Sequence, residues 1–278
     1  MSSIMFERVG IVGLGLIGAS LGLALRGRGL AGRVIGVDTD AEAVATARRR
    51  GAIDEGTADY AALEGADLVI AAVPPQSVVD AVLRAARVAR SDAILLDVAS
   101  VKASIVRTLE EALPEGARFV GGHPMAGTER QGGAGADAAL LAGRPFLIIP
   151  TMRSDAGAVD AVRSLVRSLG MRPLLLDPGV HDAIVAQVSH VPYLLAVAAV
   201  NAAEDGALGL GGPAFEALRR VAGSPVELWV EICMHNREAI LRSLGWVRDE
   251  LDRLERALSE GGLAEVLTAA RRRAGVGG

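Results

Sequence analysis

Three glycines near the start of this 278-residue chain have the spacing of a dinucleotide-binding turn, Gly13-x-Gly15-x-x-Gly18. Apolar β-forming residues precede them and a helical pattern follows. Gly13 allows a tight turn, Gly15 lets a pyrophosphate approach the backbone, and Gly18 lets the helix pack closely on the strand. The backbone N–H groups of Leu16 and Ile17, at the start of the helix, would face the phosphates. The spacing predicts a dinucleotide site between a strand and a helix.

Asp38 ends a second predicted strand, over residues 33–38, twenty residues after the last of these glycines. A carboxylate at this place accepts hydrogen bonds from an adenosine ribose and repels a 2′-phosphate. The sequence therefore favours NAD as the cofactor over NADP. The alternative is a nucleotide-free α/β domain with a glycine-rich turn.

Three segments with chemical potential follow predicted strands, at residues 73–75, 97–102 and 121–129. Ligands of open α/β sheets bind beyond the carboxyl ends of the strands, so Val73 and Pro74 are expected beside the cofactor. His123 lies in the third segment. A neutral imidazole there can take a hydroxyl proton while a hydride leaves the same carbon, and the usual histidine pKa of about 6.5 suits this role. The alternative is a structural histidine in a loop.

The elements that would position these residues alternate between strands and helices as far as residue 177. Beyond Asp38 we predict strands over 68–73, 93–97, 119–122, 146–149 and 173–176, and helices over 40–50, 60–63, 76–89, 104–113 and 156–169. This alternation predicts an α/β Rossmann-type domain with a doubly wound parallel sheet over residues 1–177.

Residues 178–278 carry helical patterns only. We predict helices over 180–204, 213–221, 225–258 (with a break near Gly245) and 263–274. Residues 189–203 are apolar almost all round, and a helix of that kind has to be buried. The rest of a monomer could hardly cover this apolar helical surface, so we expect an all-α dimerisation and substrate domain that buries it in a homodimer.

Composition narrows the function further. The formal net charge of −4 gives no electrostatic footprint for nucleic acid. Cys233 is the single cysteine, which excludes an intrachain disulfide and a thiolate zinc cluster, and no metal site is expected. The uncharged run over residues 9–25 is too short for a membrane span and follows Glu7, so we expect no targeting or membrane segment and a cytoplasmic protein.

Four motifs together resemble the prephenate/arogenate dehydrogenase family of tyrosine biosynthesis. They are the glycine turn, Asp97-Val-Ala-Ser-Val-Lys102, Gly122-His-Pro-Met-Ala-Gly-Thr-Glu129 and Ser189-His-Val-Pro192, and the resemblance extends to about Leu258. It implies NAD-dependent oxidative decarboxylation of prephenate to 4-hydroxyphenylpyruvate. Arogenate, giving tyrosine directly, is the alternative substrate.

The resemblance also implies roles for individual residues. His123 corresponds to the base for the 4-hydroxyl, and Ser100 to a hydroxyl that orients the reacting groups and lies beside the cofactor. Thr128 and Glu129 correspond to residues at the mouth of the substrate pocket. Ser100 could instead cap the following helix, and Glu129 could be a solvated loop acid.

Arg220 occupies the position of an arginine that binds a substrate carboxylate, and Trp229 that of a pocket tryptophan. His190 either faces the substrate or is hydrogen-bonded in the core. Two departures from the family pattern concern selectivity between prephenate and arogenate. Glu216 and Ala217 stand where family members often carry an Arg-Asp pair, and Tyr193 stands where many prephenate-specific members have a second histidine.

The remaining histidines, His181 and His235, carry no motif and are interpreted as structural. Two other classes share parts of the pattern: a β-hydroxyacid dehydrogenase or imine reductase, and a protein that binds NAD without turnover. The first often uses a lysine of its helical domain as the acid. The only lysine in this chain, Lys102, precedes the helical domain, which argues against the first class.

Overall fold

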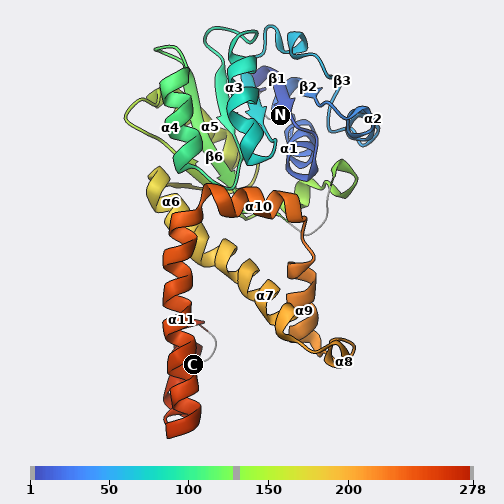
Figure 1. Ribbon diagram of the computed structural model, residues 1–278. Coiled ribbons are helices and arrows are strands. Elements are labelled where there is room, and N and C mark those ends of the chain that lie inside the picture. Colours follow the sequence, from blue (N-terminus) through green and yellow to red (C-terminus); the bar gives the residue numbers. More distant parts are fainter. Residues whose placement is uncertain (1–3, 128–131, 276–278) are drawn as a thin grey trace.

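The computed structural model describes residues 4–127 and 132–275. An eight-stranded sheet with helices on both faces lies above a set of helices in Figure 1. The strand order is β3-β2-β1-β4-β5-β6-β7-β8. The strands are β1 Phe6–Val12, β2 Ala31–Val37, β3 Glu55–Thr57, β4 Leu68–Ala71, β5 Ile94–Asp97, β6 Arg118–Pro124, β7 Pro145–Ile149 and β8 Arg172–Leu175.

The order of the strands reverses direction between β1 and β4. From β1 the chain proceeds outward to β2 and β3, and then returns to β4 on the other side of β1. Such a reversal opens a crevice at the carboxyl ends of the two strands, where dinucleotides bind. The predicted glycine turn lies at this point.

Helices cover both faces of the sheet. Helices α1 Leu16–Gly27 and α5 Ala156–Ser168 pack on one face, and α3 Val78–Ala86 and α4 Ala103–Ala112 pack on the other. Alternate residues of each strand point to opposite faces, so Ile70 joins the first core and Ala71 the second. Both faces are buried, which explains why the strands are continuously apolar. The prediction of an N-terminal α/β domain is confirmed.

The sheet differs from the prediction in two strands. β7 pairs antiparallel with β6, whereas the other strand pairs are parallel. A parallel pair needs a crossover helix, and the described part of the β6–β7 connection holds only the short turns η3 Gly133–Gly135 and η4 Ala138–Leu140. The edge strand β3, which follows helix α2 Ala41–Arg49 in the chain, was not predicted.

The chain is helical beyond residue 177, as predicted. The described helices are α6 Pro178–Val185, a π-helical turn Ala186–His190, α7 Val191–Ala202, α8 Asp205–Leu208, α9 Pro213–Ala222, α10 Val226–His235, α11 Arg237–Glu260 and α12 Leu263–Arg273. Pro192 has no N–H to donate to the carbonyl of Val188, which explains why the hydrogen-bond register changes just before α7. The short helix α8 was not predicted.

The predicted break near Gly245 is wrong. The chain turns at Asn236, with φ −112° and ψ 26°, and Gly245 continues the long helix α11. A glycine inside a helix costs only about 1 kcal/mol, which packing easily offsets. Asn236 ends α10, and its side chain is used in the site described below.

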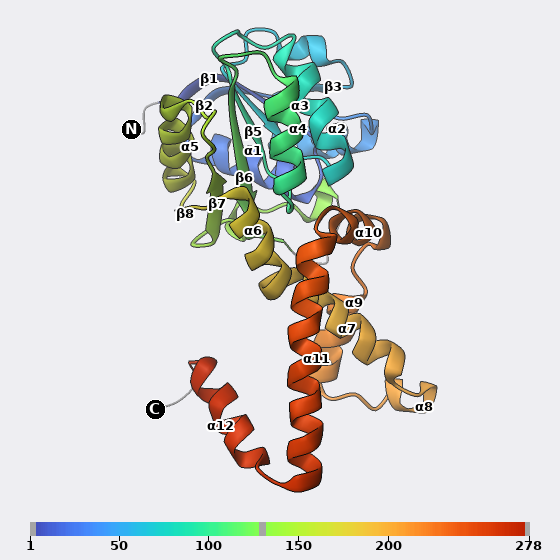
Figure 2. The same cartoon turned by 60° about the vertical axis from the view of Figure 1, so that its left-hand side comes forward.

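Much of the apolar surface of the helical domain is exposed in a single chain. Helix α11 projects away from the sheet domain, and α12 folds back beside it (Figures 1 and 2). The exposed apolar residues of the helical domain include Val188, Leu195, Val230 and Trp246. An apolar surface of this extent marks an interaction site. By length and composition alone, residues 178–202 could also cross a membrane, but the core helices of soluble proteins pass the same test.

Candidate active site

The glycine turn has the geometry that a dinucleotide requires. Gly13 has φ +91°, and a Cβ there would lie 2.5 Å from the carbonyl oxygen of Ala72. A Cβ on Gly18 would lie 1.9 Å from the carbonyl oxygen of Gly13, so close packing of α1 requires glycine there. In contrast, a Cβ on Gly15 would meet no atom within 4 Å. That open space lies at the start of α1, where no side chain caps the helix.

The carboxylate of Asp38 is fixed beside this turn. Its Oδ2 accepts from the N–H of Leu14 at 2.7 Å, and its Oδ1 accepts from the N–H of Asp40 at 2.9 Å. On the other side of the turn, a Cβ at Gly13 would be 2.9 Å from Cγ1 of Val73. The turn, the acid and the end of β4 therefore surround one place, and these residues fit a dinucleotide.

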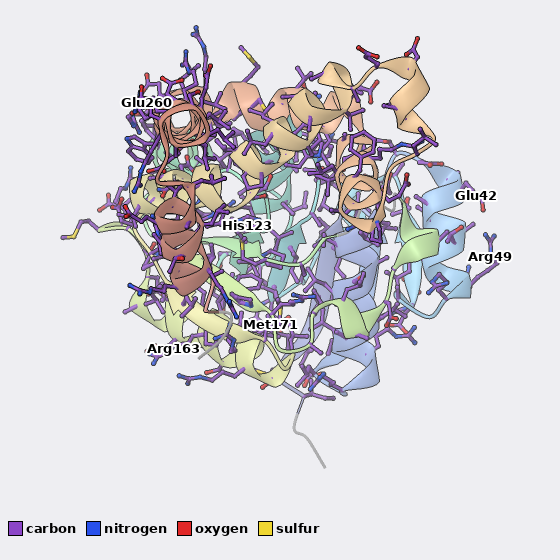
Figure 3. All side chains as sticks on the ribbon, turned by 90° about the horizontal axis from the view of Figure 1, so that it is seen from below. Glu42, Arg49, His123, Arg163, Met171 and Glu260 are labelled. Atoms are coloured by element: carbon purple, nitrogen blue, oxygen red, sulfur yellow. The ribbon has the colours of Figure 1, made fainter. Side chains whose placement is uncertain are left out.

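His123 lies near the carboxyl end of β6 and is buried. Seen from the helical end of the molecule, it lies near the centre (Figure 3). Its Nδ1 is 2.9 Å from Nε2 of His181, which belongs to α6. The contact joins the last part of a sheet strand to the first helix of the helical domain and occupies one ring nitrogen of His123.

Asp182 continues this chain of contacts. Its Oδ1 lies 2.8 Å from Nδ1 of His181 and accepts from the N–H of Lys102 at 2.9 Å. Its Oδ2 accepts from the N–H of Ala103, also at 2.9 Å. Lys102 is the N-cap residue of α4 but supplies no side-chain cap. The carboxylate of Asp182, from the helical domain, therefore caps a helix of the sheet domain.

The turn between β5 and α4 rests on a buried ion pair. Lys102 and Asp97 are both fully buried, and Nζ of Lys102 donates to Oδ2 of Asp97. The same oxygen accepts from the N–H of Ala99 at 3.0 Å. Ser100, half-buried, lies within this turn and two residues before the N-cap, so it is not the cap of α4. A buried pair of this kind fixes the conformation of the turn that carries Ser100.

The amide of Asn236 links Asp182 to His190, which in turn contacts a pair of stacked aromatic residues. Nδ2 of Asn236 donates to the backbone carbonyl of Asp182 at 2.8 Å and lies 3.2 Å from Nδ1 of His190. The ring of Trp229 meets His190 edge-on, with centroids 6.0 Å apart, and stacks on Tyr193 at 3.7 Å. Tyr193 and Trp229 therefore form one stacked aromatic pair beside His190.

Burial keeps the imidazoles of this cluster neutral. The pKa of His123 is well below its usual value because of burial, with further lowering from His181, Lys102 and His190. Burial also lowers the pKa of His181, although Asp182 opposes it, and lowers that of His190 to about 4. For Asp182, burial favours a higher pKa, but the hydrogen bonds from His181, Ala103 and Lys102 outweigh it and the pKa is lowered. A neutral His123 is a competent proton acceptor at neutral pH.

Several predicted residues come together here and others do not. His123, His190 and Trp229 belong to one region. The turn that contains Ser100 is joined to this region by the hydrogen bond from the N–H of Lys102 to Asp182. Arg220 is exposed on α9, which packs against α7. Thr128 and Glu129 lie outside the described residues. His235 is exposed and lies 3.2 Å from Oγ of Ser104, outside the cluster around His123.

Three members of the cluster were missed by the sequence analysis. His181, which we interpreted as structural, contacts His123 directly, and Asp182 and Asn236 were not considered. A cavity of about 220 Å³ elsewhere in the molecule contains none of the predicted residues. It is lined by residues such as Phe119 at the opposite end of β6 from His123.

The fold and the site define a dinucleotide-dependent dehydrogenase with a helical second domain. A family model described as "Prephenate dehydrogenase, nucleotide-binding domain" matches residues 21–175, and one described as "Prephenate dehydrogenase, dimerization domain" matches residues 177–269. The chain belongs to the prephenate dehydrogenase family. The resemblance stated from the motifs is confirmed, as is the prediction of an oxidoreductase.

Individual relatives agree with the family models. Prephenate dehydrogenase of Bacillus subtilis is 29% identical over 261 residues, which cover 90% of this chain and 70% of the relative. The structure of A. aeolicus prephenate dehydrogenase in complex with hydroxyphenyl propionate and NAD+ has 28% identity and a TM-score of 0.87, with 98% of each chain covered. Synechocystis arogenate dehydrogenase has 32% identity and a TM-score of 0.80, with 97% of this chain and 98% of that chain covered.

Proposed function

We propose that the protein oxidatively decarboxylates prephenate to 4-hydroxyphenylpyruvate with NAD. The observation that carries this proposal is the neutral, buried imidazole of His123 at the sheet edge where the dinucleotide turn lies. Arogenate is the second candidate substrate, because the similarity to Synechocystis arogenate dehydrogenase is of the same order as that to the prephenate enzymes.

NAD is proposed as the cofactor because Asp38 presents a carboxylate beside the glycine turn. When bound, NAD accepts the hydride from the ring carbon that bears the 4-hydroxyl. The chain's part is to hold the pyrophosphate at the backbone and the ribose at the carboxylate. The residues proposed for this are Gly13, Gly15, Leu16, Ile17, Gly18, Asp38, Val73, Pro74 and Ser100.

His123 is proposed as the base. The ring nitrogen that does not face His181 takes the proton of the 4-hydroxyl as the hydride leaves. The C1–carboxylate bond breaks, its electron pair enters the ring, and carbon dioxide departs. The phenolate oxygen then regains the proton from His123, so the proton count balances. A positioned base contributes about 10²–10⁴-fold.

Positioning supplies the rest, because aromatisation itself drives the reaction. Alignment of hydride, proton and carboxylate can be worth about 7–11 kcal/mol of barrier. We propose that Ser100 orients the reacting groups and that Arg220 binds a substrate carboxylate in a bidentate fork. His190 and Trp229 would line the pocket, with Thr128 and Glu129 at its mouth.

We also propose that the protein is a cytoplasmic homodimer, with the domains dividing at residues 177 and 178. The exposed apolar residues of α7, α10 and α11 support burial against a second copy. The matched dimerisation domain covers the same helices. Sedimentation of the purified protein tests this: a monomer at micromolar concentration would contradict it.

The function is tested by following reduced-cofactor formation with prephenate and arogenate in parallel, each with NAD and with NADP. We expect turnover of prephenate with NAD. The ratio between the two substrates measures what Tyr193 and Ala217 do to selectivity. NAD binding without turnover of either compound would contradict the proposal and favour a protein that binds NAD without catalysis.

A further inference from the structure

We propose that Asp182 and His181 are positioning residues that hold His123 in a single tautomer, with the proton on Nδ1 and the lone pair on Nε2. The identity of the proton that Nε2 accepts rests on the proposed function, whereas the tautomer itself does not. Three side chains then act in series, from a carboxylate of the helical domain to an imidazole of the sheet domain.

Asp182 determines which atom donates and which accepts in each hydrogen bond of this series. Its two oxygens accept from the N–H groups of Lys102 and Ala103, at the N-terminus of α4. Backbone N–H groups can only donate, and the positive end of a helix dipole favours an anion. Asp182 is therefore held as a carboxylate, which is an acceptor only. The lowered pKa of Asp182 agrees with this.

The carboxylate of Asp182 fixes the tautomer of His181. Because Asp182 can only accept, Nδ1 of His181 must carry the hydrogen across the 2.8 Å contact. His181 is fully buried and its pKa is lowered, so its ring is neutral and carries only that hydrogen. Nε2 of His181 is then an acceptor, 2.9 Å from Nδ1 of His123. Nδ1 of His123 must donate to it, which leaves Nε2 of the neutral ring with a free lone pair.

The neighbouring charges are compatible with this arrangement. Lys102, on the turn before α4, is neutralised by Asp97 from β5. His190, in the π-helical turn, is neutral. On α10, Glu231 accepts from the N–H of Gln76, and His235 contacts the hydroxyl of Ser104. The carboxylate of Asp182 is therefore the anion hydrogen-bonded to this series. When His123 takes a proton, the positive charge is stabilised through His181 without any change in the donor and acceptor pattern.

His190 has the opposite tautomer to His123, with its hydrogen on Nε2. The carbonyl of Asp182 can only accept, so the Asn236 atom 2.8 Å from it is the amide nitrogen. The second hydrogen of that amide points to Nδ1 of His190, which must accept. A neutral His190 then carries its hydrogen on Nε2. The site thus combines one imidazole that accepts, His123, with one that donates, His190.

The tautomers can be read directly from two-bond nitrogen–hydrogen correlation spectra of the histidine-labelled protein, without substrate. The chain has only four histidines, so each is assigned by substitution. We expect Nδ1–H in His123 and His181, and Nε2–H in His190. Nε2–H in either His123 or His181 would overturn the proposal. The tautomers themselves are read in the wild-type protein, and the variants serve only to assign the signals.

His181→Leu removes the acceptor while Asp182 keeps both backbone donors. We expect His123 to lose its fixed tautomer, and kcat with prephenate to fall by about 10–100-fold while NAD affinity is unchanged. His235→Leu, the same change at an exposed histidine on the same domain boundary, should alter neither. An unchanged tautomer of His123 in His181→Leu would overturn the proposal. A wild-type enzyme without turnover would refute only the proposed function, since the spectra do not depend on it.

Discussion

Nδ1 of His123 and Nε2 of His181 lie 2.9 Å apart, although the two histidines are 58 positions apart in the sequence. One belongs to strand β6 and the other to helix α6. Their contact therefore exists only where the helical domain docks on the carboxyl edge of the sheet. It commits one nitrogen of His123 to the protein, and the proposed substrate would contact the other.

The burial of His123 predicts the pH dependence of turnover. Because burial lowers the pKa of His123 well below its usual value, the neutral base persists in mildly acidic solution. We expect kcat/KM to be level through pH 6.5 and to fall only at lower pH, as His123 becomes protonated. A pH–rate profile from pH 4 to 8 measures this. An acidic limb with its midpoint at or above 6.5 would contradict a buried neutral base.

His190 predicts the pH dependence of stability. Its pKa is about 4 in the folded protein and about 6.5 in the unfolded chain, so between these values the unfolded state binds more protons. The stabilisation is complete above pH 6.5 and is lost as the pH falls toward 4. The difference corresponds to roughly 3 kcal/mol in the free energy of unfolding.

Denaturant unfolding at a series of pH values measures this contribution. His190→Asn keeps an acceptor for Asn236 but removes the titration, so its stability should fall less between pH 6.5 and 4. His235→Asn, at an exposed position, is the control and should behave as the wild type. Equal pH dependence in all three proteins would show that His190 does not titrate as described.

Arg220 and Arg219 form a matched pair of neighbouring arginines. Arg219 forms an exposed ion pair with Glu216 at 2.9 Å, a contact worth less than about 1 kcal/mol. We expect Arg220→Ala to raise KM for prephenate at least tenfold with little change in NAD affinity, and Arg219→Ala to change neither. If Arg220→Ala weakened NAD and prephenate equally, the proposed carboxylate contact would be wrong.

Asp38 should determine the choice of cofactor. Asp38→Ala removes both the ribose acceptor and the charge that repels a 2′-phosphate, so the ratio of kcat/KM for NAD over NADP should fall about tenfold or more. Asp59→Ala, which removes the acid that accepts from the N–H of Ala61 in the same domain, is the control. An unchanged ratio in Asp38→Ala would count against the proposed NAD preference.

The fold could be predicted where local pattern decides it. Apolar runs, glycine turns and helical periodicity identified the α/β domain and the helical domain. The antiparallel pairing of β7 was missed, although the lack of a predicted helix between residues 122 and 146 was a signal for it. The turn at Asn236 was also missed. No local signal distinguishes it, and its amide is used by residues of α6 and the π-helical turn.

The site could be predicted in part. Asp38 follows β2 and His123 lies near the end of β6, so position and residue type were enough to select both as candidates. His181 and Asp182 begin a helix far along the chain, and their role depends on docking against α4, which no local pattern records. Lys102 is similar: in the sequence it was part of a motif and an argument against the β-hydroxyacid dehydrogenase class, and only the fold shows that it is buried against Asp97.

His123→Asn tests the central claim most directly. The variant keeps a polar side chain at this position but no longer supplies an imidazole as the base. In rapid single-turnover measurements with saturating NAD and prephenate, the account predicts a loss of about 10²–10⁴-fold in the rate of NADH formation. It predicts only a small change in prephenate affinity and an unchanged thermal midpoint. A folded His123→Asn protein with near-normal turnover would contradict the assignment of His123 as the base.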